Sequence, residues 1–241
     1  MDLFSRYAAV ISKADADSYF AKCGFVACNN GNEVFGNGLI VGINPSRPVN
    51  GQYIPTPSFA HPWPASNVYF SKLGRFIPEI ERGRTGYLDL FPFYEQSQET
   101  LLHNIRGNEP FIASVLAVSQ EEIERISPSL IIVANKSLIP YWGAASDCVW
   151  MGYDFMPLHE DCLPESLRGR NLDIRIIKGF RHDLKTLNEI IYHPVDGICR
   201  LKGTVVLFYR HSRGIPSKDM LTEQDYNVLL HFAKKVKSTI Q

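Results

Sequence analysis

Three polar side chains lie at or near the places where buried strands are expected to end. Asn44 follows one apolar segment, Asp89 lies inside a second, and His211 follows a third. Ligands of parallel sheets bind at the carboxyl ends of the strands, so these side chains are expected to meet at one site. An amide can orient a water molecule, a carboxylate accepts hydrogen bonds, and an imidazole can hydrogen-bond a leaving group. Because an amide is a poor base, Asn44 suits hydrolysis of a bond that largely breaks before water attacks.

Positive charge is concentrated towards the C-terminus. The whole chain has 25 basic and 25 acidic residues and is formally neutral. Residues 178–241 contain eleven basic and six acidic residues, whereas residues 1–177 contain fourteen and nineteen. This asymmetry favours an anionic partner for the C-terminal quarter of the chain.

The apolar patterns predict an α/β fold. Continuous apolar runs are typical of strands covered on both faces, and alternating strands and helices predict a parallel sheet with helices on both sides. Thr222 and Asp225 have the spacing of a capping box at the start of the last helix. Strands are expected at 33–43, 86–91, 129–134, 173–179 and 204–209, and helices at 3–22, 67–80, 111–126 and 222–239, with a helix start at 136–142.

Composition and length exclude several classes of protein. The 241 residues are 45% hydrophobic and 21% charged, a composition that is typical of a globular protein and excludes intrinsic disorder. A single domain spanning 1–241 is expected, since α/β domains of this length often remain undivided. No window is apolar enough for a membrane span, and the N-terminus lacks the features of a signal peptide. We therefore expect a cytoplasmic protein that does not bind membranes.

Six prolines between residues 44 and 66 exclude a helix or an inner strand there. This segment is expected to be a long loop, and long loops in compact domains are usually functional or disordered. Its aromatic residues Tyr53, Phe59 and Trp63 favour an ordered loop.

Short motifs along the chain carry a family resemblance. The first strand ends in Gly-Ile-Asn-Pro-Ser (42–46), followed by Phe-Ala-His-Pro (59–62) and Asn-Val-Tyr-Phe-Ser-Lys (67–72). In this order and spacing they resemble the uracil-DNA glycosylase superfamily, most closely its mismatch-specific branch. Residues 88–93 and 210–216 fit the later motifs of that superfamily. The resemblance covers roughly residues 38–235 and leaves 143–200 unexplained, as a possible insertion.

The resemblance implies a three-layer α/β/α domain with a central, mainly parallel four-stranded sheet. It implies a DNA glycosylase that hydrolyses the N-glycosidic bond of a flipped base, without a cofactor. Asn44 would position the water and His211 would hydrogen-bond the departing base. The remaining roles are base binding by Gly42, Ile43, Phe59 and Asp89, and DNA binding by Ser46, Arg47, Arg210, Ser212, Arg213 and Lys218.

Three departures from the family pattern alter these expectations. Asp89 stands where relatives often have Asn, and a carboxylate accepts hydrogen bonds but does not donate them. Uracil, whose O4 also only accepts, should therefore not be the preferred base if an ionised Asp89 reads it. A protonated Asp89 could donate to O4, but that requires a raised pKa. Ser212 replaces a proline of the second loop, and Ser46 replaces the glycine that lies close to the sugar in relatives.

Other chemistries and functions remain open beside this interpretation. The five cysteines have no CxxC spacing and are expected to be reduced thiols; the pairs 23/28 and 148/162 do not match the spacing of a four-cysteine iron–sulfur site. No GxSxG motif and no metal-ligand spacing is present.

The alternatives to a glycosylase are a non-catalytic nucleic-acid-binding module of the same fold, and an enzyme acting on free nucleosides or nucleotides. The sequence leaves the base, the strandedness of the DNA and the oligomeric state open.

Overall fold

The fold is built on a six-stranded mixed sheet. The computed structural model describes residues 1–27, 37–46, 68–145, 150–181, 196–210 and 219–240. The strand order is β2-β1-β3-β6-β5-β4, in which the first four strands are parallel and β5 and β4 are antiparallel to their neighbours. The strands are β1 (Gly38–Gly42), β2 (Thr85–Asp89), β3 (Leu130–Val133), β4 (Tyr153–Pro157), β5 (Asp173–Phe180) and β6 (Val205–Phe208).

The α/β class is confirmed, but the expected four-stranded sheet is wrong. The parallel part has four strands, and β5 and β4 extend it beyond β6. The sequence does not predict β4, because it is a partly exposed edge strand that carries Asp154 and ends at Pro157. The stretch 143–200, considered as an insertion, supplies both of these added strands.

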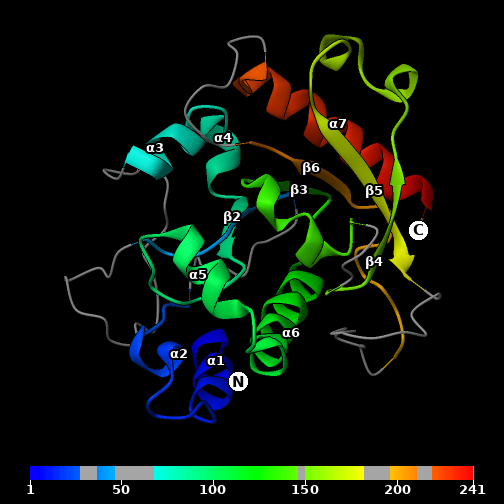
Figure 1. Ribbon diagram of the computed structural model, residues 1–241. Coiled ribbons are helices and arrows are strands. Elements are labelled where there is room, and N and C mark those ends of the chain that lie inside the picture. Colours follow the sequence, from blue (N-terminus) through cyan, green and yellow to red (C-terminus); the bar gives the residue numbers. More distant parts are fainter. Residues whose placement is uncertain (28–36, 47–67, 146–149, 182–195, 211–218, 241) are drawn as a thin grey trace.

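Helices cover both faces of the sheet. Side chains of β1 alternate, so that Leu39 and Val41 join one apolar core and Ile40 joins the other. The first core lies under α1, α2, α5 and α6, and the second under α3 and α7 (Figure 1). The helices are α1 (Leu3–Ile11), α2 (Tyr19–Lys22), α3 (Val68–Gly74), α4 (Glu79–Arg82), α5 (Gln98–Ile105), α6 (Glu109–Ile126) and α7 (Glu223–Ile240). Short 3₁₀ turns are η1 (Lys136–Leu138), η2 (Pro140–Trp142), η3 (Glu160–Cys162) and η4 (Glu165–Leu167).

The two long helices were predicted closely. α6 and α7 differ from the expected ranges by no more than two residues at either end. The capping box of α7 is present: the Asp225 N–H donates to Thr222 Oγ1 (3.2 Å), and the Thr222 N–H donates to Asp225 Oδ2 (2.8 Å). Local helix signals are reliable here because long amphipathic segments contain many independent contacts.

Three other helix predictions are corrected by local breaks. The expected helix 3–22 stops at Ile11, because the Asp15 side chain accepts the Asp17 N–H in a turn (2.9 Å) before α2 begins. The expected helix 67–80 is divided between α3 and α4, with Pro78 immediately before α4. Residues 136–142 form only the 3₁₀ turns η1 and η2, since Pro140 cannot continue a helix.

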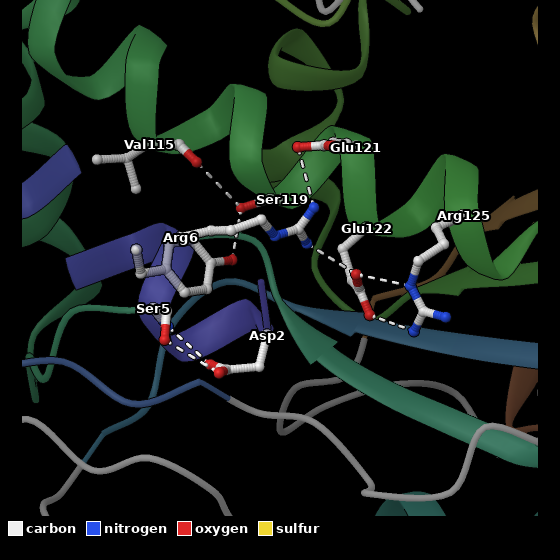
Figure 2. Close-up of polar contacts among 9 residues, drawn as sticks. Asp2, Ser5, Arg6, Val115, Ser119, Glu121, Glu122 and Arg125 are labelled. Atoms are coloured by element: carbon white, nitrogen blue, oxygen red, sulfur yellow. Dashed lines mark hydrogen bonds and ion pairs between the residues drawn. The ribbon is translucent and has the colours of Figure 1, made fainter. Parts of the chain in front are cut away.

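Charged and polar side chains attach α1 to α6. Arg6 of α1 contacts Glu121 (2.9 Å) and Glu122 (2.8 Å), and Glu122 also accepts from Arg125 (Figure 2). The buried hydroxyls of Tyr7 and Ser119 are 2.8 Å apart in the same interface. Because Glu122 and Ser119 are buried, these bonds fix the position of α1 more firmly than surface ion pairs would.

Lys237 of α7 makes stability depend on pH. Its buried Nζ donates to the carbonyls of Ser127 (2.8 Å) and Pro128 (3.0 Å) at the amino end of β3. Burial lowers the pKa of Lys237 to about 8, below its ordinary value of 10.5. The unfolded chain therefore binds more protons between these values, and the free energy of unfolding rises with pH in that window.

Relative to Lys237→Met, the free energy of unfolding of the wild type should rise by about 2 kcal/mol between about pH 7 and pH 9.5. Urea unfolding across this range measures it. Lys235→Met, which removes an exposed lysine of the same helix, is the control and should leave the pH slope unchanged. Parallel slopes for the wild type and Lys237→Met would contradict the assignment.

Candidate functional site

A cavity of about 200 Å³ opens at the carboxyl ends of β1 and β2. These ends lie together because Gly42 pairs with Asp89 in the parallel register. Four of the predicted site residues line the cavity: Ile43, Asn44, Ser46 and Asp89. The other lining residues are Val26, Pro45, Tyr69, Phe70, Tyr87, Tyr94, Glu95, Gln96 and Gln98.

The side chain of Asn44 is held in one orientation. Its Nδ2 donates to the backbone carbonyls of Pro45 (3.0 Å), Phe93 (3.3 Å) and Glu95 (2.7 Å). Carbonyl oxygens only accept hydrogen bonds, so the nitrogen must face them and Oδ1 must point the other way. Within the described parts of the chain, no hydrogen bond uses Oδ1. This oxygen is therefore an oriented acceptor at a cavity wall.

Gly42 leaves space for a buried hydrogen bond beside Asn44. The Tyr87 hydroxyl donates to Asp89 Oδ1 at 2.7 Å, and Asp89 is only 3% exposed. A Cβ at position 42 would lie 2.2 Å from Tyr87 Oη and 2.4 Å from Asp89 Oδ1. Glycine is required here by this close approach, which keeps the Asp89 carboxylate in place.

Gly42→Ala should displace Tyr87 and Asp89 and reduce ligand binding by about five- to a hundredfold, because overpacking costs about 1–3 kcal/mol and falls on the site itself. Gly38→Ala is a matched control, since its Cβ would lie 2.3 Å from Tyr226 Oη at the other end of β1. Thermal unfolding and oligonucleotide binding should be measured for both. Equal binding losses in the two variants would show that Gly42 has no special role in the site.

Aromatic side chains form much of the cavity wall. Tyr87 packs edge-on against Phe70 (centroids 4.9 Å apart) and Tyr69 (6.4 Å) at the start of α3. Tyr94 is buried on the segment that follows β2. Such walls suit a flat, unsaturated ligand, because aromatic rings favour stacked and edge-to-face contacts.

Glu95 connects three segments around the cavity. Its carboxylate accepts hydrogen bonds from the Tyr19 hydroxyl of α2 and from the Ser97 N–H (2.8 Å). Its main chain bonds Asn44 and Pro45. Burial acts to raise the pKa of Glu95, but the hydrogen bonds from Ser97, Tyr19 and Gln96 outweigh it and hold the pKa below its usual value. The carboxylate is accordingly ionised at neutral pH.

The remaining predicted residues are not brought to this cavity by the described part of the structure. Arg210 lies two residues after the end of β6 and is exposed. β3 lies between β6 and β1, which places β6 about 10 Å, or two strand spacings, from β1. The predicted residues Arg47, Phe59, His211, Ser212, Arg213 and Lys218 lie outside the described residues.

Several lining residues were not singled out from the sequence. Tyr94 and Glu95 lie in the segment after β2, where the strand-end rule directs attention without choosing a residue. Val26 lies at the cavity because the neighbouring Phe25 forms an isolated bridge with Phe93. This long-range contact has no local signal in the sequence. Tyr69 belongs to a motif that carries the resemblance, but its position against Tyr87 depends on the packing of α3 on β2.

Known proteins provide no assignment for this cavity, since no family model and no curated protein matches the chain. Within the described residues, no group of three or more His, Cys, Asp or Glu side chains is arranged to hold a metal ion. Cys28 and Cys148, of the cysteine pairs considered above, fall outside those residues. None of the described helices has the length and apolarity needed to cross a membrane.

Proposed function

We propose that the chain is a DNA glycosylase-like enzyme that hydrolyses the N-glycosidic bond of a flipped, damaged or mispaired base. The observation that carries the proposal is the oriented Oδ1 of Asn44 in the same small aromatic-walled cavity as the buried Asp89. Cavities for drug-sized ligands occupy about 300–1,000 Å³. A cavity of about 200 Å³ takes a smaller group, such as a single base.

In this mechanism, Asn44 Oδ1 accepts a hydrogen bond from a water molecule and turns the water oxygen towards the sugar. An amide is a weak base, but the reaction has a cation-like sugar that forms before water attacks, so orientation matters more than basicity. The departing base takes negative charge and needs a hydrogen-bond donor. His211 is the residue that the family resemblance offers for that role.

Asp89 sets the preference for the base in this proposal. As a carboxylate it accepts hydrogen bonds from a ligand, and it repels a carbonyl oxygen placed opposite. A base with an exocyclic amine therefore fits better than uracil. The Tyr87 hydroxyl and the space at Gly42 hold the carboxylate in position.

The test is to incubate the purified protein with labelled oligonucleotides that carry uracil, hypoxanthine, xanthine or mispaired thymine, each single- and double-stranded, followed by alkali. An oligonucleotide that also carries an amine-bearing base extends the panel to the preferred class. Cleavage at one of these bases supports the proposal. Binding without cleavage supports a nucleic-acid-binding module of the same fold. Action on free nucleosides or nucleotides alone supports an enzyme for those small substrates.

A further inference from the structure

A second depression adjoins the cavity. It has a volume of about 670 Å³ and lies between α5 and the chain that follows β3. Gln98, the first residue of α5, lines both spaces. We call this second space the α5 groove. Gln98 therefore marks the junction of the two spaces.

A series of hydrogen bonds orients the polar groups at this junction. The Ser137 N–H can only donate, so Asn135 Oδ1 must be the atom that accepts it (2.9 Å). Asn135 Nδ2 then donates to Gln98 Oε1 (2.8 Å). Gln98 must consequently turn its Nε2 the other way, and none of the hydrogen bonds among the described residues uses that nitrogen. The junction presents two N–H donors to a ligand.

A histidine and an arginine line the α5 groove further along. His103 and Arg106 are three residues apart at the end of α5, and both are exposed. Arg106 forms no ion pair with any residue in the described part of the chain. Glu99 also lines the groove and opposes an anion there. The effects of Glu99 and Arg106 on binding should therefore have opposite signs.

We infer that the α5 groove binds a phosphate ester of the substrate, next to the sugar whose base occupies the cavity. Phosphate oxygens only accept hydrogen bonds, which matches Gln98 Nε2 and the guanidinium of Arg106. The groove volume lies within the range of about 300–1,000 Å³ that holds ligands larger than a base. The inference rests on the proposed function for what fills the cavity, and it adds the place where a phosphate of the substrate is held.

Two sources could supply this phosphate ester. One is the phosphodiester of a polynucleotide strand, and the other is the single phosphate of a free nucleotide. A nucleoside without a phosphate would leave the donors of the α5 groove unused. The relative affinities of the strand, the nucleotide and the nucleoside distinguish these cases.

The measurement is the affinity of a labelled single-stranded oligonucleotide at several salt concentrations, with a deoxynucleoside monophosphate and the matching nucleoside as competitors. Arg106→Gln should weaken binding about fivefold, the effect of one exposed charge pair. It should also lower the slope of log affinity against log salt by about 0.7, the loss of one phosphate contact. Glu99→Gln should tighten binding. Arg84→Gln is the matched control, since Arg84 is equally exposed but lies just before β2, at the amino end of the sheet.

Arg106→Gln binding with the affinity and salt slope of the wild type would overturn the inference, as would a wild type that binds none of the ligands. Competition by the monophosphate as strong as that by the oligonucleotide would identify a free nucleotide as the source. Weak competition by both small ligands would identify a strand. Binding that depends on Arg106 without base release would retain the α5 groove and reject the glycosylase. Base release that Arg106→Gln does not affect would retain the glycosylase and reject the α5 groove as its phosphate site.

Discussion

Asn44→Ala is expected to lower the rate of base release at least a hundredfold, the usual effect of losing one group that acts on the reacting atoms. The variant loses the oriented Oδ1 and with it the position of the attacking water. The rate should be measured at saturating substrate, where affinity no longer contributes. Wild-type turnover in this variant would remove Asn44 from the mechanism.

Asn44 also has a structural role, and the experiment must separate the two. The two N–H groups of its Nδ2 are shared among three carbonyls, and one such hydrogen bond is worth about 1 kcal/mol, so the variant is expected to be less stable. Asn37→Ala is a useful control, because it removes an amide that bonds Glu81 (2.9 Å) at the amino end of β1. A purely structural role would reduce binding and stability together with the rate. A catalytic role leaves binding within a few fold.

Asp89→Asn is expected to change the base preference by at least tenfold towards uracil. The asparagine keeps an oxygen that accepts from Tyr87 and gains an N–H₂ donor, which suits the O4 of uracil. One hydrogen bond to a buried partner is worth about 1–3 kcal/mol, and 1.4 kcal/mol corresponds to a factor of ten. The ratio of cleavage rates for uracil and for an amine-bearing base measures the effect.

Glu95→Gln is the matched control for this prediction. It removes a second carboxylate from the lining of the same cavity while nearly preserving size. It should leave the ratio of the two rates unchanged, even if both rates fall. An unchanged ratio in Asp89→Asn would show that Asp89 does not read the base.

The elements with strong local signals could be predicted from the sequence. β1, β3 and β6 are continuous apolar runs, and α6 and α7 are long amphipathic helices. The edge strand β4 and the antiparallel direction of β5 could not be predicted, because strand direction depends on long-range pairing. α5 was missed because its eight residues bury only Leu101 and Ile105.

The site was predictable to the extent that strand ends define it. Asn44 and Asp89 follow from the rule that carboxyl ends of parallel strands meet. The orientation of the Asn44 amide depends on carbonyls from residues 93 and 95, which only the folded chain brings near. The α5 groove depends on the contact between Gln98 and Asn135, 37 residues apart, and has no signal in the sequence.

The most direct test of the proposed function is to look for a free base released from the oligonucleotide panel by the wild type and by Asn44→Ala, using mass spectrometry of the products. We predict that the wild type releases one base, carrying an exocyclic amine, and leaves an abasic strand, while Asn44→Ala releases at least a hundredfold less. Intact strands with every base, or equal release by both proteins, would contradict the proposal that this cavity cleaves a glycosidic bond.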